Sequence, residues 1–214
     1  MNSPEIACGI NVYCTGPDAA DLPSALDDMA ELGYSHIALS PISEDATDVA
    51  ALKKALNDSG IRPIPMAGQA PQANVASADE AVRARGLDLL KSSIDLAHEL
   101  EADQLNGVVY ALFGDHQEPF SGERIAESAR LVGQAADYAA QAGIRRVFTS
   151  LHIPETDVAA LKQEIGSLLR AARRHHMEVI SDVSPATCKL LDLPEFTPTS
   201  FRMLGITTLR LDYG

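Results

Sequence analysis

Tryptophan is absent from this 214-residue chain, and basic residues are scarce: 17 lysines and arginines face 30 aspartates and glutamates. The resulting net charge of -13 repels nucleic-acid phosphates and anionic lipid, so we expect neither a nucleic acid nor a membrane as partner. The sequence has no apolar run of the ~18 residues that span a bilayer, and no basic segment followed by an apolar one at its N-terminus. We therefore expect a cytoplasmic protein.

Three common motifs are also missing. The three cysteines, Cys8, Cys14 and Cys188, form no CxxC pair, which argues against a zinc site and favours buried thiols in a reducing compartment. No GxGxxG follows the first apolar segment, which disfavours a dinucleotide-binding doubly wound sheet. Without a GxSxG elbow, Ser150 and its neighbours are not expected to form a serine-hydrolase triad.

What the sequence does contain is a regular alternation of short β-branched runs and amphipathic helical segments. The expected strands are residues 6–14, 36–40, 61–66, 105–113, 145–150, 177–182 and 206–211. The expected helices are residues 21–32, 48–57, 79–100, 123–141, 155–175 and a shorter helical stretch before Gly205, and residues 68–77 are expected to form a polar loop. This order predicts an α/β fold: one TIM-type parallel (βα) barrel over residues 1–214.

The strand count leaves the barrel incomplete. Such barrels close with eight strands, and the sequence predicts seven, so the eighth βα unit is expected to be missing. Three alternatives follow: closure with seven strands, a second copy of the chain covering the open edge, or a chain that lacks a piece of its parent. An exposed strand edge favours association, so we expect the first and seventh strands to pair directly or to be covered in a homo-oligomer.

Polar residues follow the last three expected strands. His152, Asp182, Arg210 and Asp212 each stand at or just beyond the end of an apolar run. Because the carboxyl ends of parallel strands meet at one rim of a barrel, these four side chains are expected to cluster there.

Each of these residues has a functional and a structural interpretation. Asp182 and Asp212 are the candidate acid–base pair or metal ligands, or else they cap the next helix or pair with Arg210. His152 carries a proton or binds a metal, or it hydrogen-bonds within its loop. Arg210 holds a phosphate or carboxylate, or it pairs with the aspartates. His116, beside Asp115 and Glu118 in the loop after the fourth strand, is a weaker metal candidate.

Residues 6–143 resemble the xylose-isomerase-like sugar epimerases of the D-tagatose 3-epimerase type. The matching stretches are 9–13 (GINVY), 30–34 (AELGY), 77–83 (SADEAVR, with an Asp-x-x-x-Arg helix start) and 105–110 (LNGVVY). The resemblance implies that Tyr13 and Tyr110 face the sugar, with packing inside the barrel as the alternative. It also implies a divalent metal, Mn²⁺ or Co²⁺, but the family's glutamate ligands are not recognisable: Ala38 stands on the second strand, and the fifth strand reads RVFTSLH.

Residues 136–214 resemble a second group, the N-terminal barrel of the MupG-type 6-phospho-N-acetylmuramidases. The motifs are 146–155 (RVFTSLHIPE), 177–185 (MEVISDVSP) and 209–214 (LRLDYG), which are strands two to four of that family. The chain thus looks like a barrel chimera, with an epimerase-like part over residues 1–143 and a muramidase-like part over residues 144–214.

Three functions follow from these resemblances. The first is a sugar or sugar-phosphate isomerase or epimerase, which moves a proton at a carbon next to a carbonyl. The second is a glycosidase-like site for a 6-phospho-sugar, with Asp182 and Asp212 as its carboxylates. The third is a folded chimeric or truncated barrel without catalysis, so the sequence leaves open whether the chain is an enzyme. A small sugar or sugar phosphate is the expected ligand.

Overall fold

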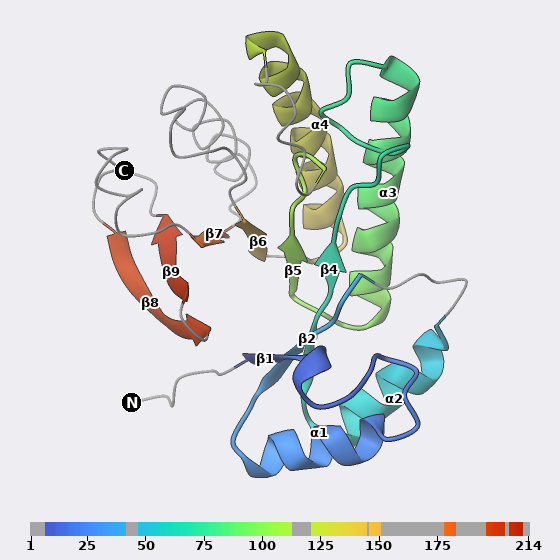
Figure 1. Ribbon diagram of the computed structural model, residues 1–214, viewed down its shortest axis with the longest axis vertical. Helices are drawn as coiled ribbons and strands as arrows, with labels where there is room; N and C mark the ends of the chain where they lie inside the picture. Colours follow the sequence, from blue (N-terminus) through green and yellow to red (C-terminus); the bar gives the residue numbers. More distant parts are fainter. Residues whose placement is uncertain are drawn as a thin grey trace.

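The computed structural model describes residues 7–41, 47–112, 121–144, 146–150, 178–182, 196–203 and 206–211. In the first half of the chain, strands and helices alternate as expected (Figure 1). The elements there are β1 (Ala7–Gly9), the 3-10 helix η1 (Ile10–Val12), α1 (Leu22–Glu31), β2 (His36–Ala38), α2 (Val49–Ser59), β3 (Arg62–Ile64), β4 (Met66–Ala67), α3 (Glu80–Glu99), β5 (Gln104–Gly107) and α4 (Gly122–Gln141). They are followed by the strands β6 (Arg146–Ser150), β7 (Glu178–Asp182), β8 (Phe196–Met203) and β9 (Ile206–Leu211).

The helices begin where the sequence places their caps. The Asp48 carboxylate accepts from the Ala51 amide at 2.9 Å, and the Ser121 hydroxyl accepts from the Arg124 amide at 3.2 Å. These bonds satisfy amide donors that the first helical turn leaves without a partner. Asp21 occupies the expected cap of α1 but makes no side-chain capping bond.

The strands from β1 to β7 run parallel in chain order. One sheet is β1-β2-β3, and the second continues β4-β5-β6-β7. Pro65 separates β3 from β4, because proline has no amide hydrogen to donate to a ladder. Its carbonyl still accepts from the Asn106 amide at 2.9 Å, so the segment from β3 to β4 passes from one sheet to the next. The expected strand at residues 61–66 is confirmed, with this break.

The last two strands depart from the prediction. β9 pairs antiparallel with β7, and β8 pairs antiparallel with β9, so the expectation of a seventh parallel strand at 206–211 is wrong. Only residues 204 and 205 separate β8 from β9, whereas a parallel crossover needs a dozen or more, so these two strands can pair only as an antiparallel hairpin. The expected helical stretch before Gly205 is also wrong over Phe196–Met203, where threonine and aromatic residues favour a strand.

The expected pairing of the first and last strands is not what the structure shows. Both edges of β9 are occupied, by β7 and β8, and β8 lies beside β1 (Figure 1). No ladder joins β8 to β1 among the described strands, so the two sheets do not form a closed barrel there. Coverage by a second copy of the chain stays a prediction.

Two hydrophobic clusters hold the helices on the sheets. One packs α1 and α2 on β2 and is centred on Leu26, Ile37 and Leu52. The other packs α3 and α4 on β5 and is centred on Ile94 and Leu105. Among the described helices, none combines the length and the apolarity needed to cross a membrane.

Candidate functional site

The carboxyl ends of the parallel strands define the candidate site. In Figure 1 the arrows of β4 and β5 point to the end of the molecule where α3 and α4 begin. Beyond β1 and β2, the Asn11 amide donates to the Ser40 hydroxyl oxygen at 3.2 Å. This bond joins two neighbouring strand ends through neutral groups that can exchange hydrogen bonds with sugar hydroxyls. Neither residue was predicted as a site residue from the sequence, although Asn11 lies within the quoted GINVY stretch.

Asn106 is a second polar group that sequence reasoning missed. Its neighbour Leu105 packs into the cluster under α3 and α4, and successive side chains of a strand point to opposite faces. The half-buried Asn106 side chain therefore lies on the sheet face turned away from these helices, in register with Met66 of β4. The signal was available, since β5 carries two amide side chains on this face, Gln104 and Asn106, and amide side chains are mostly exposed.

The two candidate tyrosines lie in different hydrophobic clusters. The Tyr13 ring packs edge-on against Tyr34, with centroids 6.1 Å apart, beside the α1–α2 cluster. Partial removal from water, together with a hydrogen bond to Tyr34, raises the pKa of the Tyr13 phenol above its ordinary value. Tyr110 is only 4% exposed and belongs to the cluster under α3 and α4. This placement favours the packing interpretation for both, and their sugar-binding role stays a prediction.

For two of the remaining predicted site residues, Asp182 and Arg210, the structure gives the backbone register. The other two, His152 and Asp212, lie outside the described residues. Asp182 ends β7, opposite Ser150 of β6 and Thr208 of β9. Arg210 pairs with Ile180 rather than with Asp182, because β9 runs antiparallel. The same direction brings the carboxyl end of β9 toward the amino end of β7, so the premise that all strand ends share one rim does not hold for β9. The roles of His152 and Asp212 stay predictions.

The predicted metal site finds no ligand set in the described part of the chain. Among the residues that the structure describes, no group of three or more histidine, cysteine, aspartate or glutamate side chains is arranged to hold a metal ion. His116, with Asp115 and Glu118, lies outside those residues. The described residues alone therefore supply no ligand set for Mn²⁺ or Co²⁺, and the proton transfers proposed below are assigned to side chains.

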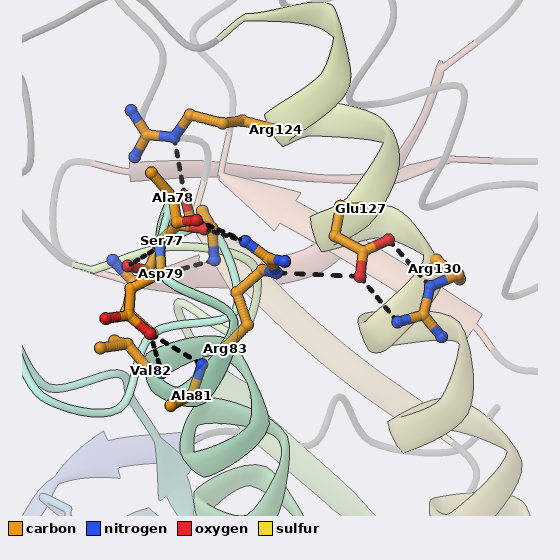
Figure 2. A network of polar contacts seen from close by, with 11 residues as sticks. Ser77, Ala78, Asp79, Ala81, Val82, Arg83, Arg124, Glu127 and Arg130 are labelled. Atoms are coloured by element: carbon orange, nitrogen blue, oxygen red, sulfur yellow. Dashed lines mark hydrogen bonds and ion pairs between the residues drawn. The ribbon is translucent and has the colours of Figure 1, made fainter.

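The loop between β4 and α3 spans residues 68–79. Its polar sequence suggested few contacts, but side chains of α3 and α4 form several hydrogen bonds with it. Figure 2 shows its end, where the Asp79 carboxylate caps α3 by accepting from the Ala81 amide at 2.7 Å and the Val82 amide at 3.2 Å. One Arg83 nitrogen, Nη1, donates to the carbonyls of Ser77 and Ala78, each at 2.9 Å. In the Asp-x-x-x-Arg helix start that carries the resemblance, Asp79 therefore caps α3 and Arg83 binds the backbone of the preceding loop.

Glu127 of α4 links this loop to a second arginine. Its carboxylate accepts two hydrogen bonds from Arg130, at 2.9 and 2.7 Å, and lies 3.8 Å from Nε of Arg83 (Figure 2). The hydrogen bonds from Arg130 lower the pKa of the Glu127 carboxyl, against a smaller opposing effect of partial burial. The negative charge on Glu127 is thus favoured by the folded state.

This pKa shift predicts a pH dependence of stability. Because the folded-state pKa of Glu127 is depressed, its contribution is complete above the ordinary value of 4.5 and is lost as the pH falls through the folded-state value. The stability difference between the wild type and Glu127→Gln should therefore be larger at pH 7 than at pH 3. Urea unfolding at both pH values measures it, with the exposed Asp88→Asn of α3 as the control. A difference that does not change with pH would contradict the assignment.

Known proteins match the two parts of the chain differently. Residues 128–214 match the family described as 6-phospho-N-acetylmuramidase, N-terminal. The L-ribulose 3-epimerase of Methylomonas sp. (strain DH-1) is 31% identical over 140 residues, which cover 65% of this chain and 49% of the epimerase. The ketose 3-epimerase of Arthrobacter globiformis is 26% identical over 178 residues, which cover 83% of this chain and 62% of that protein. The chain thus spans about half to three-fifths of the length of these relatives.

Solved structures give the same picture of the fold. The D-allulose 3-epimerase from Methylomonas sp., in complex with D-allulose, aligns with a TM-score of 0.69 at 26% identity over 82% of this chain and 61% of that one. A structure of L-ribulose 3-epimerase aligns with a TM-score of 0.72 at 20% identity over 88% of this chain and 63% of that one. The α/β fold is that of the sugar epimerases, and similarity to these enzymes in the N-terminal part joins a muramidase-type match in the C-terminal part, as the sequence predicted.

Proposed function

We propose that this chain is a sugar isomerase or epimerase acting on a small ketose. The observation that supports it most directly is the parallel order of β1 to β5 with α1 to α4, in a chain 31% identical to an L-ribulose 3-epimerase over 140 residues. In this proposal the fold is a TIM-type barrel whose epimerase-like part ends near residue 143, and the muramidase-like part supplies the remaining strands.

The proposed reaction moves a proton at the carbon next to the ketose carbonyl. Such a reaction needs a base to remove the proton and an acid to return it to the other face. Asp182, at the carboxyl end of β7, is the candidate proton carrier in this proposal. His152 and Asp212 stay candidates from the sequence, and the antiparallel direction of β9 favours His152 over Asp212 as the second proton carrier. Asn11, Ser40 and Asn106 are its candidate hydrogen-bond partners for sugar hydroxyls, because each presents a neutral polar group on or near the strand ends.

Ketose conversion tests this proposal. The purified protein should convert D-allulose or L-ribulose to its epimer, detected by chromatography, with Mn²⁺, with Co²⁺ and with a chelator in parallel. Asp182→Asn should lower the rate by about 100-fold or more if the carboxylate transfers the proton. A folded wild type that converts neither ketose under any of the three conditions would reject the proposal.

The muramidase match over residues 128–214 supports a second candidate function. In that candidate, Asp182 and Asp212 serve glycoside cleavage and Arg210 holds the phosphate of a 6-phospho-sugar. Calorimetry with a 6-phosphorylated sugar and its unphosphorylated counterpart distinguishes the two. Preference for the phosphorylated form, lost in Arg210→Ala, would favour the second candidate, while equal binding of both would favour the first.

A further inference from the structure

Three arginines from two helices donate to backbone carbonyls of the β4–α3 loop. Arg83 of α3 binds the carbonyls of Ser77 and Ala78, as described above. Nε of Arg124, on α4, donates to the Ala76 carbonyl at 2.7 Å, and Nε of Arg85 donates to the Gln72 carbonyl at 2.7 Å. Figure 2 shows the Arg83 and Arg124 side chains reaching the loop from the two helices.

Part of this loop is buried, and the Ala76 carbonyl that Arg124 binds belongs to that part, whereas Gln72 and Ala78 are exposed. Asn74, Val75 and Ala76 are only 5%, 0% and 2% exposed. A buried carbonyl without a partner is costly, and guanidinium groups supply donors in a fixed planar arrangement. Gly86 adds to the fit, since it lets the backbone of Asn74 and Val75 lie directly on α3.

Arg124 differs from the other two arginines because it comes from the next βα unit. The loop follows β4 and leads into α3, whereas α4 follows β5. Glu127 strengthens the same link, as its carboxylate lies between Arg83 and Arg130. The contacts therefore tie together the segments that follow two neighbouring strands, at the end of the sheet where the candidate site lies.

We propose that Arg83 and Arg124 are positioning residues of the sugar site: they hold the β4–α3 loop as a preformed wall beside the carboxyl ends of β4 and β5. This inference rests on the proposed function. A wall that is ordered before the ligand arrives removes the entropic cost of ordering it on binding, so the arginines act on affinity through the loop and not by touching the sugar.

Amide hydrogen exchange tests the loop part of the inference. In Arg124→Gln, amides of residues 69–78 should exchange about 10-fold faster than in the wild type, because a charge-assisted hydrogen bond is lost. Arg124→Lys should show a smaller increase, since lysine keeps the charge but not the planar group. Amides of α1 and α2 should not change in either variant. Lys54→Gln, which removes an exposed ion pair of α2, is the matched control and should leave residues 69–78 unchanged.

Calorimetric titration with D-allulose tests the link to the site. Arg124→Gln should weaken binding by about 10-fold, Arg124→Lys should restore part of the affinity, and Arg83→Lys gives a second measurement should Arg124→Gln fail to fold. Unchanged loop exchange, or faster exchange with unchanged affinity, would overturn the inference while leaving the proposed function intact. A wild type that binds no ketose while its loop responds to Arg124→Gln would instead reject the sugar site and, with it, the positioning role.

Discussion

Replacing Gly107 with alanine is expected to lower the free energy of unfolding by about 3–5 kcal/mol. Gly107 ends β5 with φ of 125°, a backbone conformation that residues with a side chain rarely adopt. A β-carbon there would lie 1.8 Å from the Ala67 carbonyl oxygen, so β4 and β5 would have to separate. The effect combines backbone strain with overpacking at the junction of two paired strands.

Urea unfolding measures this loss, and Gly122→Ala is the matched control. Gly122 opens α4, its φ is not positive, and a β-carbon there would meet no atom within 4 Å. Alanine at that position should change stability by less than about 1 kcal/mol, in the favourable direction. Equal stability of Gly107→Ala and the control variant would show that β4 and β5 do not approach each other as described.

Gly86→Ala is expected to destabilise the protein by about 1–3 kcal/mol. Alanine is a better helix former than glycine, so in an isolated helix the change would stabilise by about 1 kcal/mol. In α3, however, the new β-carbon would lie 2.5 Å from the Val75 nitrogen and 2.7 Å from the Asn74 carbonyl carbon. The loop would have to move away from the helix, and the steric cost exceeds the helical gain.

Ser92→Ala in the same helix gives the reference for this prediction. Ser92 is exposed, and its replacement should stabilise slightly through helix propensity alone. Thermal unfolding of both variants separates the two effects. A Gly86→Ala protein as stable as Ser92→Ala would mean that the loop does not pack on α3 in solution.

The order of strands and helices up to β6 could be predicted because it depends on local patterns, and so could the strand β7; the expected helix at residues 155–175 lies outside the described residues and stays a prediction. The apolar spacing of α1 to α4 and the short β-branched runs between them are properties of neighbouring residues. The β8–β9 hairpin could not be predicted in the same way. The threonine and phenylalanine residues of Phe196–Met203 favour a strand, but this signal competes with the helical interpretation of the segment before Gly205.

The candidate site was less accessible from sequence than the fold. Strand-end aspartates such as Asp182 stand out by type and position, but partners from other segments decide what they do. The arginine contacts to the β4–α3 loop depend on Arg124, which is 48 residues from the carbonyl it binds. Such a pairing leaves no periodic signal. Tyr13 and Tyr110 could mislead in another way. An aromatic ring near a strand end suggests stacking on a sugar, whereas both rings pack in or against hydrophobic clusters.

Solvent deuterium incorporation tests the proposed epimerase function most directly. Removal and return of a proton next to the carbonyl exchanges a carbon-bound hydrogen with solvent. A ketose incubated with the folded protein in D₂O should therefore lose the proton NMR signal of that hydrogen, and the Asp182→Asn variant should slow this loss about 100-fold. Full retention of the signal with the wild-type protein, with and without added Mn²⁺ or Co²⁺, would contradict the proposed function.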